Sequence, residues 1–226
     1  MREDYPYDIV ENPIKLARLS FWSEEEYGDL LACQKEEIRI EDFNAKYLRK
    51  AAILCLDITG FTKSTLKQNA LYSFFRILDI QKVCYPVFEK YNARTIHSFA
   101  DNLTAIFDNP EKAVDAALEV HHRINLFNQK YYTEDNTAQS CIGIGYGDVY
   151  TIGPDKAMGD EMNRASKLGE DYAKGSETLI TENVYNSVRN RNDLKFILQM
   201  HTELPFPFYL CSKTTIHKKK RMEEEE

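Results

Sequence analysis

The sequence contains no long hydrophobic run and no excess of basic residues. No apolar stretch approaches the roughly 18 residues that a membrane-spanning helix requires, and the first residues lack the apolar core of a signal peptide. The net charge is -7 at pH 7, which argues against a nucleic-acid-binding surface. We therefore expect a cytoplasmic protein with no integral membrane segment and no nucleic acid partner.

The cysteines show neither an even number nor a Cys-x-x-Cys motif. There are five of them, most within apolar runs: Cys33, Cys55, Cys84, Cys141 and Cys211. Buried free thiols in a reducing compartment account for this distribution better than disulfide bonds do.

The 226 residues are enough for one domain of about 150 to 200 residues and an appendage. A content of 43% hydrophobic and 29% charged residues is typical of a soluble globular protein, and no internal repeat is visible. We predict an N-terminal arm over residues 1–47 with one short helix, which packs on the main domain or on a second subunit. Residues 48–213 are expected to form the main domain, and residues 214–226 a charged, solvated tail.

The main domain alternates apolar runs of strand length with segments of helical periodicity. Predicted strands are 51–57, 93–99, 103–107, 140–150, 178–180, 194–200 and 206–211, and predicted helices are 71–91, one from 110, 159–174 and a short one from 181. Strands separated by helices, with a hairpin signal at 100–102, indicate an α/β fold in which helices flank a mixed sheet.

A carboxylate ends the first apolar strand of the main domain. Asp57 needs a partner there, because an unpaired buried charge is costly. It could cap the helix that starts near Thr62 or bind a metal ion, and the residue alone does not decide between the two. The turn at 59–64 favours the metal, since Gly60 permits close backbone approach and N–H groups at a helix start attract anions.

A second carboxylate, Asp101, lies in the tight connection between two predicted strands. Alone, the pair Asp101-Asn102 is a better signal of a hairpin turn than of a metal site. Neighbouring strands lie only about 4.8 Å apart, so Asp57 and Asp101 at adjacent strand ends could share ions. Two such carboxylates suit Mg²⁺ or Mn²⁺.

A third polar group is predicted on the helix over 159–174. Asn163 and Lys167 are four residues apart and therefore share one face of that helix. An amide one turn from a cation could orient a ribose and neutralise a phosphate, although on an arbitrary helix such a face is simply solvated.

In order and spacing, these segments resemble the catalytic domain of class III nucleotidyl cyclases. The family pattern is Asp-Ile-x-Gly-Phe-Thr after a strand, Gly-Asp-x-x-x-Ala-x-Phe in a hairpin, Gly-Ile-x-x-Gly-x-Val, and Gly-x-x-x-Asn-x-Ala-x-Arg-Leu on a helix. Here the corresponding residues are 57–62, 100–107, 143–149 and 159–168, and the resemblance covers roughly 48–212. It implies a ferredoxin-like βαββαβ core with a mixed, mainly antiparallel sheet and flanking helices.

The resemblance also implies a reaction and its residues. Asp57 and Asp101, with the backbone carbonyl of Ile58, would bind two Mg²⁺ or Mn²⁺ ions, and Asn163 would position the ribose. The triphosphate would be held by backbone N–H groups of Thr59, Gly60, Phe61 and Thr62. The 3′-oxygen of a nucleoside triphosphate would attack the α-phosphate and expel pyrophosphate, and a homodimer would complete two shared sites.

Four positions depart from the family pattern. Lys167 stands where the family has an arginine that stabilises the transition state; lysine keeps the charge but lacks the bidentate fork. The neighbouring Arg164 lies about 100° round the helix and is a poor substitute. Cys141 replaces a strand arginine, and His97 and Lys156 occupy the two positions that contact the base.

The base-contacting positions favour a pyrimidine substrate. Lys156, a hydrogen-bond donor, stands where adenylyl cyclases often have an acid that accepts from the amino group of adenine. The adjacent Asp155 could supply that acid if this loop were shifted by one residue relative to the family pattern. Donors suit keto oxygens, so we expect UTP ahead of CTP. In these respects the chain is similar to the pyrimidine cyclases of bacterial anti-phage (Pycsar) systems, in which bulky side chains narrow the base pocket. Tyr47 or Phe99 could do so here.

Other functions stay open at this point. The chain could be an adenylate or guanylate cyclase, or a catalytically degenerate cyclase-fold protein that binds a nucleotide or a partner. A palm-like polymerase or diguanylate cyclase shares the two-metal layout, but the sequence lacks a Gly-Gly-Asp/Glu-Glu-Phe segment and a basic surface. A role in defence would imply a separate effector protein that senses the cyclic nucleotide.

Overall fold

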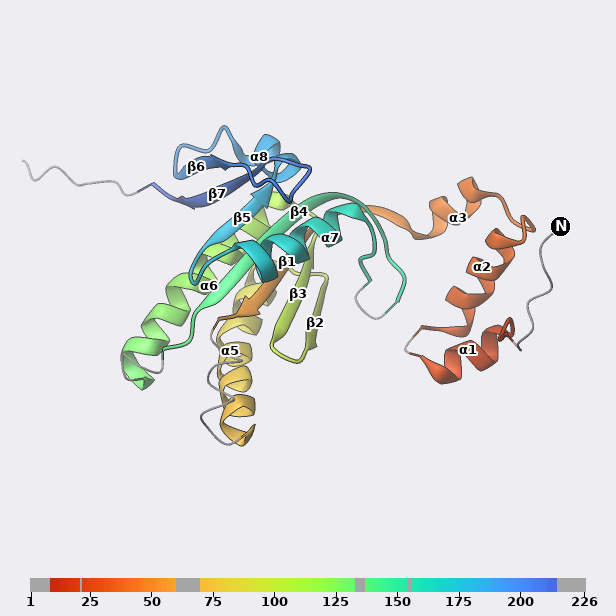
Figure 1. Ribbon diagram of the computed structural model, residues 1–226, viewed down its shortest axis with the longest axis horizontal. Helices are drawn as coiled ribbons and strands as arrows, with labels where there is room; N and C mark the ends of the chain where they lie inside the picture. The colour runs from red at the N-terminus through yellow and green to blue at the C-terminus, as the bar shows by residue number, and fades with distance from the viewer. Residues whose placement is uncertain (1–8, 21, 60–69, 133–136, 154–155, 215–226) are drawn as a thin grey trace, which may run out of the picture.

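A seven-stranded sheet forms the centre of the molecule, with strand order β2-β3-β1-β4-β5-β7-β6 (Figure 1). The computed structural model describes residues 9–20, 22–59, 70–132, 137–153 and 156–214, with only the backbone of Ala70. The strands are β1 (Leu48–Ile58), β2 (Thr95–Phe99), β3 (Asn102–Phe107), β4 (Ser140–Tyr150), β5 (Thr178–Thr181), β6 (Leu194–Gln199) and β7 (Phe208–Lys213).

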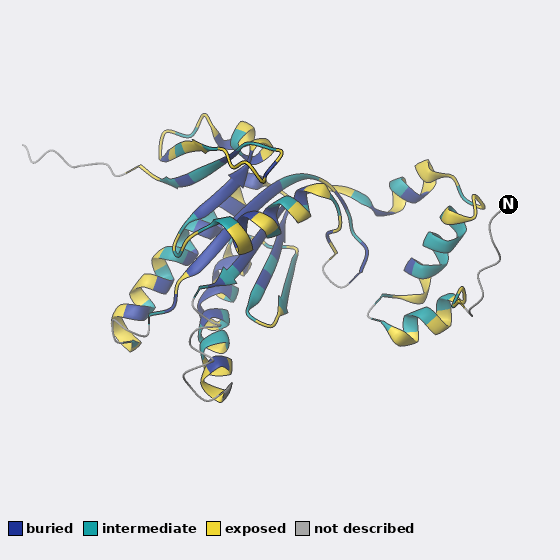
Figure 2. Cartoon of the chain, in the orientation of Figure 1, coloured by how far each residue is buried: buried dark blue, intermediate teal, exposed yellow. Residues whose placement is uncertain are grey.

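Helices cover both faces of this sheet. They are α1 (Pro13–Leu19), α2 (Glu24–Gln34), α3 (Ile40–Tyr47), α5 (Ala70–Lys90), α6 (Pro110–Tyr131), α7 (Asp160–Lys167), a π-helix (Leu168–Tyr172) and α8 (Glu182–Val188). The main core lies between the sheet and α5, α6 and α8, whereas α7 packs on the opposite face (Figure 1). Because both faces are covered, residues 51–56 of β1 are buried without alternation (Figure 2).

The order β1-α5-β2-β3-α6-β4 is a βαββαβ unit, which confirms the predicted fold class. All neighbouring strands are antiparallel except β4 and β5, which run parallel. In the centre, β1 pairs with β3 on one side and with β4 on the other. The C-terminal end of β1, which carries Asp57, therefore lies between the β2–β3 hairpin and the start of β4.

Most predicted elements of the main domain are present, and β4 has the bounds that the sequence indicated. The predicted helix over 159–174 is different: α7 ends at Lys167, and a π-helix follows. Gly169 lies in this π-helix, where a Cβ would come within 2.8 Å of the Cys55 carbonyl oxygen. The chain thus continues directly along the sheet surface there.

In the part of the N-terminal arm that the structure describes there are three helices instead of the single one that we predicted. Asn12 caps α1 by accepting a hydrogen bond from the Lys15 N–H at 2.9 Å. A capping box between Ser23 and Glu26 starts α2. Helices α1 and α3 are only 7 and 8 residues long, too short for a clear periodic pattern.

The arm packs on its own chain, beside the end of β4 and the connection that follows it (Figure 1). The contact is a small apolar cluster made of Phe43, Tyr47 and Ile152, with Trp22, Leu30, Cys33, Ile38 and Tyr150 packed around them. Of the predicted charged tail, all but Thr214 lies outside the described residues.

Two further expectations concern cysteines and membranes. None of the five cysteines, all of which lie in the described residues, forms a disulfide bond, and four of them are buried. Burial raises the pKa of the Cys84 thiol, so this group stays protonated at neutral pH. In the described parts of the chain, no helix combines the length and the apolar character needed to cross a membrane.

A histidine is enclosed where α6 meets β4 and β5. His121 Nε2 lies 2.9 Å from Thr178 Oγ1, and Ser140 Oγ lies 3.2 Å from His121 Nδ1. Burial lowers the pKa of His121 from 6.5 to about 4, against a smaller opposing effect from a hydrogen bond to the Glu177 backbone. The ring is therefore neutral in the folded protein at pH values where it is charged in the unfolded chain.

This difference predicts acid sensitivity. As the pH falls from 6.5 toward 4, His121 is protonated in the unfolded state before it is protonated in the folded state. The free energy of unfolding therefore decreases over this pH range. His121→Gln should lose less unfolding free energy than the wild type between pH 7 and pH 4.5, by about 2 kcal/mol. Urea unfolding at both pH values measures this. The exposed neighbour provides the control, since His122→Gln should follow the wild type; equal pH dependence of all three proteins would contradict the prediction.

Candidate active site

The two aspartates singled out in the sequence lie close together. Leu56 of β1 pairs with Leu103 of β3, so Asp57 comes next to the hairpin connection that contains Asp101. Burial raises the pKa of Asp57 to about 6, and the charges of Asp101 and Glu170 add to this, although a hydrogen bond from the Ile58 N–H acts in the opposite direction. Among the described residues, no lysine or arginine forms an ion pair with Asp57 or Asp101. A cation would relieve this repulsion.

The donor set fits a hard divalent ion that has few protein ligands. Within the described ranges, no group of three or more His, Cys, Asp or Glu side chains is arranged to hold a metal. Mg²⁺ is commonly bound by one or two carboxylates, with substrate phosphates and water completing its shell. Asp57 and Asp101 match that arrangement, and Ile58, whose side chain is buried on the other face, could add its carbonyl oxygen.

His97 lies on the same sheet face as Asp57. Cross-strand partners share a face, and the register places His97 opposite Thr104, and Thr104 opposite Cys55. Cys55 contacts Met162 of α7, with 3.8 Å between the sulfur atoms. Because alternate residues of a strand point to the same side, Asp57 faces the α7 side together with Cys55.

The predicted phosphate turn is only partly described. The Thr59 N–H donates to the Gln139 carbonyl oxygen at 2.9 Å, and Thr59 Oγ1 donates to the same oxygen at 3.2 Å. This N–H is therefore already hydrogen-bonded to the residue that precedes β4, and it is not available to a phosphate. Gly60, Phe61 and Thr62 lie outside the described residues, so any backbone donors for phosphate would have to come from them.

The structure places Asn163 and Lys167 together on α7, as the spacing indicated. Both are exposed, whereas Glu161 and Ala165 of the same helix are buried against the sheet. Lys167 Nζ lies 3.4 Å from Asp171 Oδ2, an exposed contact on the following turn. The Asn163 face of α7 thus points to solvent, away from the sheet.

No family model matches the sequence, and no curated protein matches it. Solved structures with a similar fold include adenylyl cyclase CyaB from P. aeruginosa, with 19% identity, a TM-score of 0.63, and coverage of 74% of this chain and 95% of that chain. The adenylate/guanylate cyclase/hydrolase from Silicibacter pomeroyi has 22% identity and a TM-score of 0.62, and covers 73% and 95%. The guanylate cyclase domain of RhGC from Catenaria anguillulae, in complex with GTP, has 14% identity and a TM-score of 0.60, and covers 73% and 96%.

This is the cyclase fold. At such low identities the likeness establishes the architecture, and the chemistry has to be argued from the residues.

Three alternate glycines of β4 let α7 lie directly on the sheet of this cyclase fold. A Cβ at Gly143 would be 2.0 Å from the Ala165 carbonyl oxygen, and one at Gly145 would be 2.3 Å from the Glu161 carbonyl oxygen. A Cβ at Gly147 would be 2.7 Å from Glu161 Cγ. Backbone therefore meets backbone, and the position of Asn163 depends on this contact.

Glu161 is a residue that sequence reasoning missed. This buried carboxylate accepts hydrogen bonds at Oε2 from the Tyr146 N–H and Thr181 Oγ1, both at 2.8 Å. At Oε1 it accepts them from Asn183 Nδ2 at 3.1 Å and from Arg164 at 3.2 Å. It therefore fastens the first turn of α7 to β4 and to the β5–α8 junction. The sequence alone did not mark Glu161 as buried, because glutamate is usually exposed.

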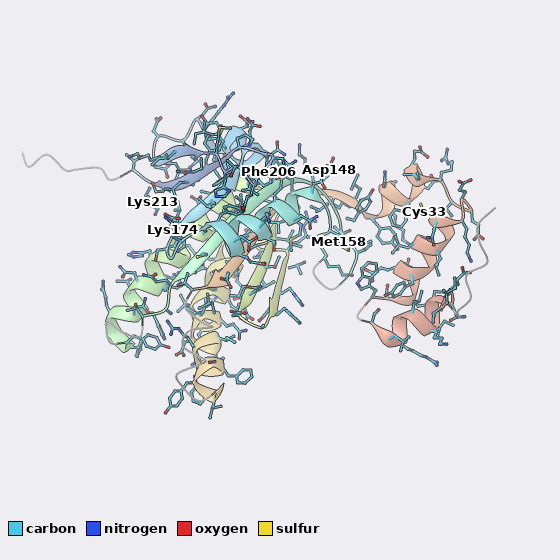
Figure 3. The ribbon with its side chains drawn as sticks, in the orientation of Figure 1. Cys33, Asp148, Met158, Lys174, Phe206 and Lys213 are labelled. Atoms are coloured by element: carbon cyan, nitrogen blue, oxygen red, sulfur yellow. The ribbon has the colours of Figure 1, made fainter. Side chains whose placement is uncertain are left out.

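The two arginine departures have structural consequences. Arg164 is directed to Glu161 and to the ring of Phe206, labelled in Figure 3, which lies 4.9 Å from its guanidinium carbon. It does not share the face of Asn163 and so does not replace the family arginine. Cys141 pairs with Asp57 and donates to the Ala173 carbonyl oxygen at 2.9 Å. Burial raises the pKa of Cys141 to about 12, helped by the Asp57 charge, so the thiol is neutral.

The candidates for contact with the base have different surroundings. Lys156 binds the arm: its Nζ lies 2.6 Å from Glu26 Oε1. The expectation that Tyr47 narrows a base pocket is wrong, because its ring is buried against Phe43 and its hydroxyl donates to Asp29 at 2.6 Å. Phe99 is 75% exposed, next to the hairpin connection. Asp155 lies outside the described residues.

Two cavities open elsewhere in the described structure. One of about 700 Å³ is lined by His121, Asn128 and Gln139, among others, and one of about 490 Å³ lies beside Glu161 and Asn183. Neither lining includes Asp57, Asp101 or Asn163, so neither is taken as the candidate active site.

The role of Glu161 can be measured. Glu161→Ala leaves the Thr181 hydroxyl, the Asn183 amide and the Tyr146 N–H without their buried acceptor, and it should lower the free energy of unfolding by about 3 kcal/mol. Chemical denaturation checks the value. Asp160→Asn, an exposed acid on the same turn, is the matched control and should change stability by less than about 0.5 kcal/mol. Equal effects of the two substitutions would refute the anchoring role.

Proposed function

We propose that this protein is a nucleotidyl cyclase, a phosphorus-oxygen lyase that converts a nucleoside triphosphate to a 3′,5′-cyclic nucleotide and pyrophosphate. The observation that carries the proposal is the placement of Asp57 beside Asp101, at the end of β1, in a chain with the cyclase fold. A degenerate nucleotide-binding protein would not need two repelling carboxylates at a half-buried position, since they bring a cost without a function.

The residues would divide the work as follows. Asp57, Asp101 and the Ile58 carbonyl would hold two Mg²⁺ or Mn²⁺ ions, which when bound supply the positive charge that acidifies the 3′-hydroxyl and offsets charge on the leaving group. The 3′-oxygen bonds to the α-phosphorus, the bond from the α-phosphorus to the bridging oxygen breaks, pyrophosphate leaves, and the hydroxyl proton passes to solvent. Asn163 would orient the ribose, and Lys167 would place one positive charge near the α-phosphate.

The placement of these groups supports a homodimer with two shared sites. Asp57 lies on the sheet at the end of β1, whereas Asn163 and Lys167 occupy the solvent face of α7. One chain therefore offers two half-sites that do not face one another. In a dimer with a two-fold axis, α7 of each subunit would lie at the aspartates of the other subunit, which gives two equivalent sites.

The substrate we propose is a pyrimidine nucleotide, with UTP ahead of CTP. His97 shares the face of Asp57, and Lys156 retains N–H donors beyond the one given to Glu26. The burial of Tyr47 in the arm removes one of the side chains expected to narrow the pocket, and this favours a purine as the second candidate. The proposed role as a source of a second messenger for a separate effector in anti-phage defence rests on the sequence resemblance.

An activity assay tests the proposal. With Mn²⁺ and each of the four ribonucleoside triphosphates, the purified protein should form a cyclic nucleotide, identified by mass spectrometry, with UTP as the preferred substrate. Asp57→Asn should reduce the rate by about 100-fold or more, whereas Asp148→Asn, an exposed acid at the far end of β4, should retain it. No cyclic product from any nucleotide would refute the function, and cyclic AMP alone would refute the base assignment.

Shared sites predict complementation between two inactive variants. In a heterodimer of Asp57→Asn and Asn163→Ala subunits, one site carries both changes and the other carries neither. Co-expression should therefore restore about a quarter of the wild-type activity, because half of randomly formed dimers are mixed and each has one intact site. Co-expression of Asp57→Asn with Asp101→Asn is the control and should restore none. Activity that stays absent in mixed dimers of the first pair would exclude shared sites.

A further inference from the structure

Two carboxylic acids are buried within the described residues, Glu26 and Glu161, each 5% exposed. Glu161 fastens α7 to the sheet. Glu26 belongs to the N-terminal arm, more than a hundred residues earlier in the chain, yet it contacts the connection between β4 and α7. A buried carboxylate is costly unless it is fully paired, so its partners indicate what it holds in place.

Glu26 holds that connection at two points. Its Oε1 accepts hydrogen bonds from Lys156 Nζ at 2.6 Å and from the Gly153 N–H at 3.2 Å. Its Oε2 accepts from the Ser23 N–H at 2.7 Å, within the capping box of α2. Burial raises the pKa of Glu26, but the hydrogen bonds and charge of Lys156 and the bonds from Ser23 outweigh it, so the group is ionised at neutral pH.

The connection needs such support because its backbone is unusual. Gly153 has a φ of +75° and is buried, and Lys156 has a φ of +52°, in the left-handed region that a non-glycine residue seldom adopts. A Cβ on Gly153 would lie 3.0 Å from Nε1 of Trp22, so the indole of the arm covers this glycine directly. The arm thus restrains both left-handed residues.

The restrained segment leads straight to the Asn163 helix. Met158, labelled in Figure 3, pairs with Tyr150 through hydrogen bonds of 2.8 and 2.9 Å. The Asn163 N–H donates to the Gly159 carbonyl oxygen at 3.0 Å, in the first turn of α7. A few residues therefore separate the arm contact from the proposed ribose-binding residue.

We propose that Glu26 is a positioning residue for base selection: the arm, through Glu26 and Trp22, holds Gly153 and Lys156 in place, so that Lys156 discriminates between bases. This inference rests on the proposed function. A donor discriminates between a keto oxygen and an amino group only when it is held in one place. Lys156 alone, on a flexible stem, would reach either kind of base edge.

Glu26→Gln tests the inference, because it keeps the shape and removes the charge that holds Lys156. The ratio of kcat/KM between the preferred nucleotide and the next best should fall about tenfold, the worth of one charged hydrogen bond. The kcat for the preferred nucleotide should change by less than about threefold. Glu24→Gln, an exposed acid on the first turn of the same helix, is the matched control and should leave the ratio unchanged.

The Lys156→Met variant shows whether Glu26 acts through Lys156. It leaves Glu26 with its Gly153 and Ser23 donors, so the arm stays docked while the donor is lost. The double variant Glu26→Gln/Lys156→Met should have the same ratio as Lys156→Met alone. Additive effects, or an unchanged ratio in Glu26→Gln, would overturn the proposal.

The chain carries its own reporter of arm docking, since Trp22 is the single tryptophan. The wavelength of Trp22 emission should be the same in Lys156→Met as in the wild type, because the arm stays docked. A shift of this emission to the solvent-exposed value in Glu26→Gln would mean that the arm has undocked in that variant. The test then rests on Lys156→Met, in which an unchanged kcat/KM ratio between the two nucleotides overturns the proposal. Equilibrium affinities for the four nucleotides give a readout separate from turnover. A wild type that makes no cyclic nucleotide would refute the proposed function, and the inference would then stand or fall on whether Glu26→Gln levels those affinities.

Discussion

The direct contact between α7 and β4 is the constraint on which the rest of the structure depends. Gly143, Gly145 and Gly147 leave three successive positions on the α7-facing side of the strand without a side chain, and the helix occupies that space. Glycine weakens a strand because it adds chain entropy and no packing. The four hydrogen bonds of Glu161 offset this locally, and they fix the rotation of α7 as well as its distance. With that rotation set, Asn163 has only the solvent face to occupy.

The sequence allowed the architecture of the main domain to be predicted, because its signals are local. Strand β4 has the bounds that the sequence indicated, and β1 is a continuous apolar run covered on both faces. The neighbourhood of Asp57 and Asp101 followed from the same logic, since a hairpin returns the chain to the adjacent strand. Periodicity and turn chemistry were sufficient for these elements.

What escaped prediction depends on contacts between distant segments. Glutamate is usually exposed, so nothing in the sequence marks Glu26 or Glu161 as buried. Several of their partners lie on other elements, and for Glu26 more than a hundred residues later in the sequence. Tyr47 was a plausible pocket residue until its neighbours were known, because the direction of an aromatic ring is set by packing. Thr59 similarly donates its N–H to the Gln139 carbonyl oxygen, next to the β1–β4 pairing, where spacing alone suggested a free donor.

The two buried glutamates hold the two ends of one segment. Glu26 binds Gly153 and Lys156, and Glu161 fixes the start of α7 a few positions later. Buried charges of this kind contribute little net stability, because desolvation offsets most of their attraction. What they contribute is specificity of structure: all hydrogen bonds of each carboxylate form together in only one arrangement of the elements that supply the donors. The segment they hold carries Lys156 and leads into α7, which carries Asn163 and Lys167.

The pairing of β1 with β4 has a consequence for how the protein is made. Residues 48–58 leave the ribosome long before residues 140–150, which are their partners in the centre of the sheet. Closing so long a loop is slow, and until it closes the apolar β1 has one unprotected edge. During synthesis the strand that ends in Asp57 is therefore the segment most in need of shielding from other chains. A nascent chain stopped before β4 would present an aggregation-prone partial sheet in place of the complete domain.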